Sequence, residues 1–594
     1  MIRVADYIID QLQKNGVEHV FTVTGRGALF LTDALAARKE LTPVCLHHEQ
    51  AAAFAAIAYS EHRQGLGACL VSTGCAGTNA LTGVLNAWQD GIPCVFISGQ
   101  NKLKETSHYT GIPLRTFGQQ EADIIPIVRS ITKYAVMITD PRTIAYEVGK
   151  ALHLARSGRK GPVWIDVPLD VQNMRVKPEE LEPFVPDAAD TPDPRQGDVQ
   201  YLAGLVRHAR RPILLIGSGV RSADAIRDLE ALIEKCRFPV VYGHSAPDIY
   251  GPDNLLCIGS VGTMGCSRAG NFAIQNSDLV IVLGNRLSPL TTGTDCEKFA
   301  RAAKIVVVDI DAVEHSKPGV AIDRLVLADV KKTIQSLLAE DLKATEEDWL
   351  KQCAHWKSVF PRCEEKYKKS EQVDLYYLAE CLSEVLPEES VLLTDSGLIE
   401  LILPHNIAFK RGQRCIHPAS QGSMGYALPA VVGAHFSSRS PVVAVIGDGS
   451  IMMNLQELAT ISYHKIPAKI FVINNNAYAV IRKRQKELFG SRTIGTDPSD
   501  GVGCPSFEKV ARGFDIPYAR IEHSHDLRSR LHAVLGQPGP VLCEVMGLED
   551  QEYISSSHAR DSKKRIVRRP IEDQAPYLDR DVFLSEMIVE PIDQ

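Results

Sequence analysis

The chain has 594 residues, of which 45 % are hydrophobic and 23 % are charged, values typical of globular proteins with several domains. Fibrous and disordered classes are therefore excluded. Its 65 basic and 72 acidic residues give a formal charge of −7 without a long run of one sign, so we expect no nucleic-acid partner. No stretch approaches the roughly 18 consecutive apolar residues of a membrane span, and the charged amino terminus predicts no export signal. Fourteen scattered cysteines without a CxxC pair predict buried, reduced thiols in a cytoplasmic protein.

Strands rich in Val and Ile alternate with helical stretches along most of the chain, which is typical of βαβ units around parallel sheets. The pattern stops at 185–198, where Pro and Asp accumulate and predict an exposed connector. A charged helical stretch at about 344–370 is predicted to be a second linker. We therefore expect an α/β protein with three doubly wound parallel-sheet domains and a carboxyl-terminal arm packed on the body or on a neighbouring subunit. The expected boundaries are 1–184, 198–343, 371–554 and, for the arm, 555–594.

The strongest chemical signal lies in residues 447–476, where one buried strand ends in a Gly-Asp-Gly turn and the next ends in an Asn pair. A helix from about Met453 to Tyr463 is predicted between them. Because parallel strands joined by such a crossover end at the same edge of the sheet, we expect Asp448 and Asn475 to lie together. A carboxylate and an amide oxygen suit Mg²⁺, which also binds substrate phosphates, so the pair predicts a bound diphosphate.

Glycines on both sides of Asp448 allow a diphosphate to approach the backbone, and the first amides of the following helix would face it. Each feature alone is common in α/β proteins. Together, the GDG turn and the later NN resemble the metal motif of the thiamine diphosphate-dependent enzymes, and LQELATI is similar to the acetolactate synthase branch. The resemblance implies that Asp448, Asn475 and the backbone carbonyl of Ala477 hold the metal. It further implies cofactor contacts from Gly447, Gly449 and Ser450.

A glutamate at the start of an Ala-rich helix gives an independent indication. Thiamine chemistry needs a carboxylic acid beside the aminopyrimidine ring to relay a proton. In CLHHEQAAAFAAIAYS, Glu49 closes a strand and opens a strongly apolar helix, an environment that favours the protonated acid. Glu49 could instead be an ordinary acid at a helix N-terminus, favoured by the helix dipole. Its HEQ context resembles that of the family's glutamate and implies the catalytic role.

Further segments resemble the same family over nearly the whole chain, among them TGRG, STGCAGTN, TFGQQEAD and QGSMGYALPA. The resemblance implies that Gln120 lines the reaction chamber and that Met424 is the apolar wedge that bends the cofactor, although such a Met could also be core filler. Since the family's first and third domains meet across a subunit contact, it implies a homodimer or homotetramer. The other implied cofactor contacts are Gly25, Gly74 and Asn79.

The central region carries three features of a nucleotide site. GSG at 217–219 follows a predicted strand and can take a pyrophosphate, although turn-forming glycines are also common. GNRLSPLTTG resembles the FAD-contacting segment of acetolactate synthases and keeps Arg286, and Arg159 matches their flavin-contacting arginine. These similarities imply FAD near Gly219, Arg159 and Arg286.

The chain departs from acetolactate synthases where they bind the acceptor. Leu290 replaces the arginine that holds the acceptor's carboxylate, with Ser288 and Pro289 in place of two acids, and an apolar side chain cannot form a bidentate fork. Arg26 stands where the family has glycine and is predicted to meet an anionic substrate group, although it could also point toward an acid. The basic run 482–486 replaces the region of the substrate-gating tryptophan, although most such runs are solvated helix faces. We expect these changes to favour a larger, phosphate-bearing acceptor such as a nucleotide-linked ketosugar.

The sequence therefore predicts a thiamine diphosphate- and Mg²⁺-dependent carboligase or lyase. It would decarboxylate a 2-oxo acid, with pyruvate as the expected donor, and pass the acyl anion equivalent to a carbonyl acceptor. Alternatives within the class are acetolactate synthase itself, a simple 2-oxo acid decarboxylase and a sulfoacetaldehyde acetyltransferase-like enzyme. Outside it are a flavin-dependent pyruvate oxidase and a nonenzymatic nucleotide-binding relative, which the presence of both Glu49 and Asp448 disfavours.

Overall fold

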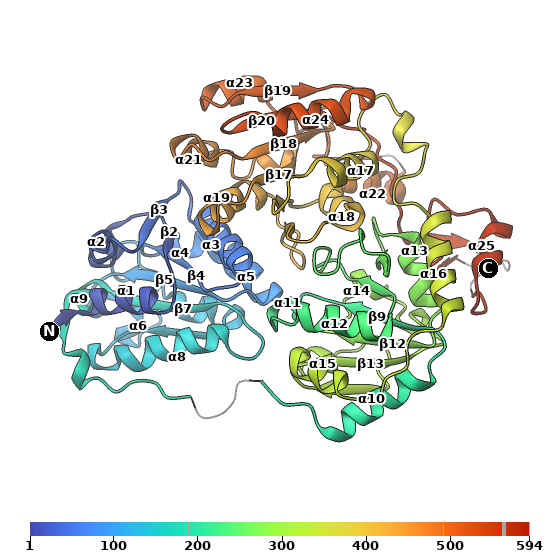
Figure 1. Cartoon of the computed structure of the whole chain (residues 1–594). Helices are drawn as coiled ribbons and strands as arrows, with labels where there is room; N and C mark the ends of the chain where they lie inside the picture. The colour runs from blue at the N-terminus through green and yellow to red at the C-terminus, as the bar shows by residue number, and fades with distance from the viewer. Residues whose placement is uncertain (187–190, 491, 561–565, 593–594) are drawn as a thin grey trace.

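Three six-stranded sheets follow one another along the chain, and every strand pair within them is parallel (Figure 1). The computed structural model describes residues 1–186, 191–490, 492–560 and 566–592. Helices cover both faces of each sheet, and the strands are accordingly rich in buried Val, Ile and Leu. The prediction of three doubly wound α/β domains is confirmed.

The amino-terminal sheet has the strand order β3-β2-β4-β5-β7-β6. Helices α1, α2 and α8 pack on one face of this sheet, while α3 and α5 pack on the other. Its strands are β2 (His19–Thr22), β3 (Thr42–Cys45), β4 (Gly67–Val71), β5 (Cys94–Gln100), β6 (Tyr134–Met137) and β7 (Val163–Pro168). Its main helices are α1 (Val4–Lys14), α2 (Leu29–Ala36), α3 (Glu49–Arg63), α4 (Cys75–Asn79), α5 (Leu81–Asp90), α6 (Ser107–Thr110) and α8 (Ile144–Arg156).

The central sheet has the order β11-β10-β9-β12-β13-β14. Helices α10, α12 and α15 share a core on one face, and α13 and α16 share a core on the other. Its strands are β9 (Pro212–Ile216), β10 (Val240–Tyr242), β11 (Cys257–Ser260), β12 (Leu279–Leu283), β13 (Lys304–Asp309) and β14 (Arg324–Leu327). Its main helices are α10 (Gln196–His208), α12 (Ile226–Cys236), α13 (Arg268–Gln275), α14 (Pro289–Thr292), α15 (Val330–Leu338) and α16 (Glu347–Val359).

Helix α16 lies in the stretch predicted to be a linker, but it belongs to the cover of the central sheet. Trp349 and Trp356 are seven positions apart on the same helix face, and both are buried in that domain's core. The described part of the carboxyl-terminal arm reaches the same core, where Phe583 of α25 (Arg580–Glu586) packs against Phe272. Part of the predicted connector, 187–190, lies outside the described residues.

The carboxyl-terminal sheet has the order β16-β15-β17-β18-β20-β19. Helices α17, α18 and α24 cover one face, and α19 and α21 cover the other. Its strands are β15 (Val391–Leu393), β16 (Arg414–Ile416), β17 (Val442–Gly447), β18 (Lys469–Asn474), β19 (Tyr518–Ile521) and β20 (Val541–Met546). Its main helices are α17 (Leu375–Val385), α18 (Leu398–Asn406), α19 (Ala427–Ser437), α20 (Asp448–Ile451), α21 (Glu457–Tyr463), α22 (Ala479–Phe489), α23 (Phe507–Gly513) and α24 (Leu527–Leu535).

The amino- and carboxyl-terminal domains share one core through helices α3 and α19, which lie side by side between the blue and orange parts of Figure 1. Their backbones approach so closely that a Cβ on Gly433 would lie 2.1 Å from the carbonyl oxygen of Ala55. The small residues of the Ala-rich helix α3 therefore serve this helix contact, and the contact fixes the start of α3 beside the carboxyl-terminal domain.

None of the helices in the described ranges combines the length and hydropathy that a bilayer span requires. All fourteen cysteines lie within those ranges, none of them forms a disulfide there, and ten are buried.

Candidate functional site

The edge formed by β17 and β18 brings together the aspartate and the asparagine loop that the sequence paired. Asp448 follows β17 directly, and its carboxylate accepts hydrogen bonds from the backbone N–H groups of Gly449 and Asn476, both at 2.7 Å. The side-chain oxygen of Asn475 accepts a longer bond, 3.4 Å, from the N–H of Ala477. The parallel pairing of the two strands therefore places Asp448 against residues 475–477.

Asp448 is a carboxylate in an unfavourable place for a negative charge. It is 3 % exposed, and burial raises its pKa to about 6, although the surrounding backbone N–H groups oppose this. Among the described residues no cationic side chain forms an ion pair with it. A carboxylate, an amide oxygen and a backbone carbonyl at one edge form the kind of oxygen set that Mg²⁺ binds.

The helix expected from Met453 to Tyr463 is wrong in its start and its continuity. Helix α20 begins at Asp448 and ends at Ile451, and α21 begins only at Glu457. Asn454 in the intervening turn donates from its side chain to the carbonyl oxygen of Gly425, 2.9 Å away, so this turn is held by a tertiary contact to the segment before α19.

A second buried acid supports this edge. Asp395 follows β15 and accepts a hydrogen bond of 2.7 Å from the hydroxyl of Ser450, which in turn accepts one of 2.9 Å from the N–H of Gly425. Asp395 is fully buried, and burial raises its pKa to about 8. Sequence reasoning missed Asp395, although its position two residues after the strand VLL gave a signal similar to that of Asp448.

One of the two glycines that flank Asp448 is held close to a large side chain. A Cβ on Gly449 would lie 2.0 Å from the ring of Tyr478, so the ring covers this glycine. Gly447 is the N-cap of α20. Met424 is half-buried and precedes Gly425, whose φ of +82° bends the chain between it and α19. The hydrogen bond from the N–H of Gly425 to the Ser450 hydroxyl oxygen fixes this turn, and the wedge role of Met424 stays a prediction.

The amino-terminal domain contributes a second set of predicted residues. Glu49 is the first residue of α3 and is half-buried, and its carboxylate accepts a hydrogen bond of 2.9 Å from the side chain of Asn79, at the end of α4. Gly74 lies directly against Gln120, since a Cβ on it would come within 1.8 Å of the Gln120 carbonyl oxygen. The structure thus groups Glu49 with Asn79 and Gly74 with Gln120.

Arg26 is exposed and donates a hydrogen bond of 2.6 Å to the side chain of Gln119, the neighbour of Gln120. Its partner is a neutral amide, and no ion pair to an acid is formed within the described residues. Gly25 before it leaves no space for a side chain, because a Cβ would lie 2.5 Å from the side chain of Ser72. Arg26 thus stays beside the predicted chamber.

The two sets are linked within one chain through hydrogen bonds of neighbouring residues. The N–H of His47 donates to Glu457 at 3.1 Å, and Asn454 donates to Gln50 at 3.1 Å, so the start of α3 is bound to the turn that follows Asp448. Across the described residues no hydrogen bond joins Glu49 to Asp448.

The three residues implied to contact FAD line a cavity of about 630 Å³ between the amino-terminal and central domains. Gly219 packs there against Gly284, with room for no Cβ. Arg159 forms ion pairs with Asp311 at 2.8 Å and Glu314 at 2.7 Å. Arg286 lies 3.9 Å from the same glutamate. Burial alone would raise the pKa of Glu314, but Lys317 and Arg159 hold it below its ordinary value.

The departures from the family pattern fall in two places. Leu290, on α14, lines the same central cavity together with Ser288 and Pro289. Arg482 is not part of an exposed basic surface: it is 2 % exposed and is paired with Asp497, Glu549 and Asp550. The interpretation of 482–486 as a cluster facing a phosphate is therefore wrong for Arg482, because three acids already neutralise it.

Comparison with known proteins identifies the three domains one by one. The chain matches the thiamine pyrophosphate enzyme models for the N-terminal TPP binding domain over residues 2–127, the central domain over 199–337 and the C-terminal TPP binding domain over 395–545. These ranges correspond to the three sheets.

Similar proteins extend over almost the whole chain. The acetolactate synthase large subunit of Porphyra purpurea is 31 % identical over 560 residues, which cover 92 % of this chain and 92 % of that protein. Acetolactate synthase 1, chloroplastic, of Zea mays is 30 % identical over 574 residues, 93 % of this chain and 86 % of its own. The large subunit of Cyanidium caldarium is 29 % identical over 559 residues, 91 % and 92 % of the two chains. The chain therefore belongs to the thiamine diphosphate-dependent enzymes, in their acetolactate synthase-like branch.

Proposed function

We propose that this thiamine diphosphate-dependent carboligase decarboxylates pyruvate and transfers the two-carbon unit to a carbonyl acceptor that carries phosphate, such as a nucleotide-linked ketosugar. The observation that carries the cofactor assignment is the buried Asp448 carboxylate, held against residues 475–477 without a cationic partner among the described residues. Acetolactate synthase proper and a simple 2-oxo acid decarboxylase are the alternatives, and their products distinguish them.

The residues at the β17–β18 edge fit a magnesium diphosphate. Asp448, the side-chain oxygen of Asn475 and the carbonyl of Ala477 would bind the ion, and Ser450 would contact the diphosphate. Bound thiamine diphosphate supplies the carbanion-stabilising thiazolium that decarboxylation requires. Glu49 would hold the proton exchanged with the aminopyrimidine ring, and Asn79 orients its carboxylate.

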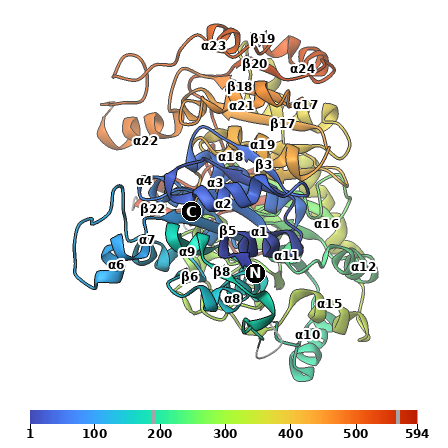
Figure 2. The ribbon, with the colours of Figure 1, turned by 90° about the vertical axis from the view of Figure 1, so that its left-hand side faces the viewer.

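The exposure of the amino-terminal set supports a homodimer or homotetramer in which two chains complete one site. Glu49 is half-buried, and Asn79, Gln120 and Arg26 are exposed in the single chain, whereas a carbanion reaction needs a chamber that excludes water. Helices α6 and α22 project on the same side of the molecule (Figure 2). The two helices and the loop after α6 expose Tyr109, Ile112, Ile481, Leu488 and Phe489. Such apolar surface is typical of a contact between chains.

The central cavity supports FAD as a second, non-reacting ligand. Its volume is in the range of ligand pockets, and the glycine turn after β9 opens into it. Arg159 and Arg286 would face the diphosphate only when their pairs with Glu314 loosen.

The acceptor assignment rests on side chains that differ from acetolactate synthases. Leu290 offers no group that binds a carboxylate, and exposed Arg26 offers a guanidinium beside Gln120 that can bind a phosphate oxygen. Ten buried cysteines without a disulfide in the described chain support a reducing compartment, which we propose to be the cytoplasm.

The experiment that tests the function is incubation of the full chain with thiamine diphosphate, Mg²⁺ and labelled pyruvate. Separate reactions contain 2-oxo acids, aldehydes or nucleotide 4-ketosugars as acceptors, and products are identified by mass. We expect a labelled branched sugar nucleotide. Glu49→Gln serves as the control, because it should lose turnover by about 10²- to 10⁴-fold while still binding cofactor. Acetolactate as the sole efficient product would contradict the acceptor assignment, and full activity of Glu49→Gln would contradict the role of that acid.

A further inference from the structure

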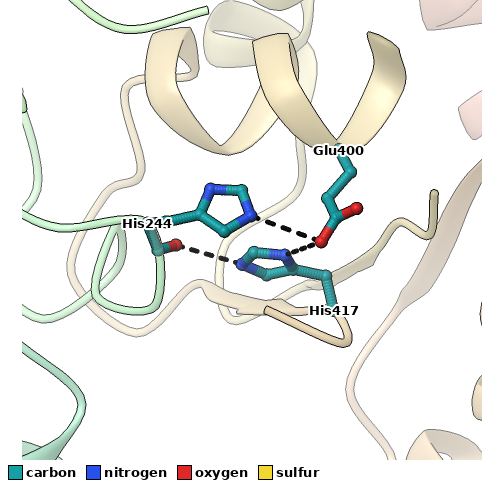
Figure 3. A group of neighbouring side chains, drawn as sticks. All are labelled: His244, Glu400 and His417. Carbon is teal, nitrogen blue, oxygen red and sulfur yellow. Dashed lines mark hydrogen bonds and ion pairs between the residues drawn. The ribbon is translucent and has the colours of Figure 1, made fainter. Parts of the chain in front are cut away.

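A buried cluster of two histidines and a glutamate lies where the central and carboxyl-terminal domains meet (Figure 3). His244 follows β10 of the central sheet, His417 follows β16, and Glu400 lies on α18. The three residues are 6 %, 4 % and 6 % exposed. The thiamine and flavin chemistry described above uses none of them.

The hydrogen bonds of His417 determine which of its nitrogens carries the proton. Its Nε2 lies 3.2 Å from the backbone carbonyl oxygen of His244, and a carbonyl oxygen only accepts, so Nε2 is the donor. The lone pair of the neutral ring is then on Nδ1. That atom has no hydrogen-bond donor near it and faces the carboxylate of Glu400 at 3.5 Å. With His417 neutral, two electron-pair donors therefore face each other in a buried space, and either a proton on Nδ1 or a cation between the two groups removes this conflict.

A chain of contacts continues from the other side of the His244 ring. Its Nδ1 lies 2.6 Å from Nε2 of His405, and Nδ1 of His405 lies 2.6 Å from the thiol sulfur of Cys266. When the thiol donates to the carbonyl oxygen of Met264, 3.1 Å away, Nδ1–H of His405 donates to the sulfur and Nδ1–H of His244 donates to His405. In that order of donors the lone pair of His244 Nε2 is directed at Glu400, 3.3 Å away.

We propose that His244 Nε2, His417 Nδ1 and a Glu400 carboxylate oxygen bind one divalent transition-metal ion of the zinc class. The three atoms lie within 4.8 Å of one another, and the two distances to Glu400, 3.3 and 3.5 Å, match the separation of about 3.4 Å between ligands around tetrahedral zinc. The second nitrogen of each histidine is already hydrogen-bonded, as is usual for metal-ligating histidines.

The ligand types separate this site from the one at Asp448. Imidazole nitrogens favour Zn²⁺, Co²⁺ or Ni²⁺, whereas the oxygen set at Asp448 favours Mg²⁺. The ion would join the central domain to the carboxyl-terminal domain, since His244 comes from one and Glu400 and His417 come from the other. It would also lie beside the central cavity, which His244 lines. Three protein ligands leave one position for water or an anion.

The test uses the full chain after removal of metals with a chelator and dialysis against Zn²⁺ in the presence of a large excess of Mg²⁺. We expect one zinc per chain by elemental analysis, and with Co²⁺ an absorption spectrum of a tetrahedral nitrogen and oxygen site without a thiolate band. Glu400→Gln and His417→Gln should each weaken binding at least 100-fold. His355→Gln, which changes an exposed histidine on α16 that contacts Glu586, should leave binding unchanged.

Less than about 0.1 zinc per wild-type chain would overturn the proposal and would assign the cluster to an imidazolium–carboxylate pair. The cobalt spectrum and the wild-type stoichiometry decide the matter even if a variant fails to fold. Equal zinc binding by wild type and Glu400→Gln would place the ion elsewhere and would also overturn it.

Discussion

Two groups of acids lie near predicted cofactor sites, and their surroundings differ in charge. At the edge of the carboxyl-terminal sheet, Asp448 and Asp395 are buried beside backbone amides and a hydroxyl, and burial raises their pKa values to about 6 and about 8. At the central cavity, Glu314 in its wall and the nearby Asp311 are paired with Arg159, and the pKa values of both acids are lowered despite partial burial.

Within the described chain, the site at Asp448 lacks a positive charge, whereas the central cavity already contains the arginines that neutralise its acids. A buried carboxylate without a counterion is costly, and a bound cation removes that cost. In the central cavity the arginines already have partners, so an anionic ligand must compete with Glu314 for them. We therefore expect the edge at Asp448 to gain from binding a metal diphosphate, whereas the central cavity would bind a dinucleotide only by exchanging ion pairs.

The largest expected effect comes from Asp448→Asn. Loss of the metal-binding carboxylate should reduce affinity for thiamine diphosphate with Mg²⁺ by more than about 100-fold. Mutation of residues that only hydrogen-bond to metal ligands already lowers metal affinity by about 10- to 100-fold. Binding is measured by the quenching of intrinsic fluorescence, and circular dichroism reports the fold. Asp348→Asn is the matched control, since Asp348 is 98 % exposed. If Asp448→Asn bound the cofactor as tightly as wild type, the assignment of the metal site to this edge would be wrong.

The sequence predicted the pairing of Asp448 with Asn475 but not the partners of Arg482. Asp448 and Asn475 could be paired because the strand-helix-strand pattern between them fixes where both strand ends lie. The partners of Arg482 could not be predicted, since Glu549 and Asp550 come from after β20, a strand distant in sequence. A local pattern identifies a charged run, but only the fold shows which of its members are buried.

The next largest effect is expected from Asp395→Asn and concerns the pH dependence of stability. Its folded pKa of about 8 lies above the ordinary value of 3.8, so its stabilising contribution is complete below about pH 4 and is lost as the pH rises to about 8. Asp395→Asn keeps an acceptor for the Ser450 hydroxyl and carries no charge. Between about pH 6 and pH 8 the free energy of unfolding of the variant should rise by about 2 kcal/mol relative to wild type, or about 2 °C in thermal midpoint for a chain of 594 residues. Thermal unfolding of the cofactor-free proteins at several pH values measures this difference in stability. Parallel pH profiles of variant and wild type would show that Asp395 does not titrate between about pH 6 and pH 8.

The smallest effect tests whether the ion pairs of the central cavity oppose ligand binding. Glu314→Gln removes the charge that holds Arg159 at 2.7 Å and lies 3.9 Å from Arg286. Both guanidinium groups then have more freedom to bind a diphosphate, so affinity for FAD should rise about tenfold, or about 1.4 kcal/mol. Calorimetric titration with FAD and with ADP measures this, and Glu346→Gln, an exposed acid paired with Lys343, is the control. Because the adenosine diphosphate part is common to both ligands, a gain for both would place the arginines at the diphosphate. Weaker binding would instead mean that Glu314 itself holds the ligand, for example through a ribose hydroxyl, and that the paired charges of this cavity are part of its recognition surface.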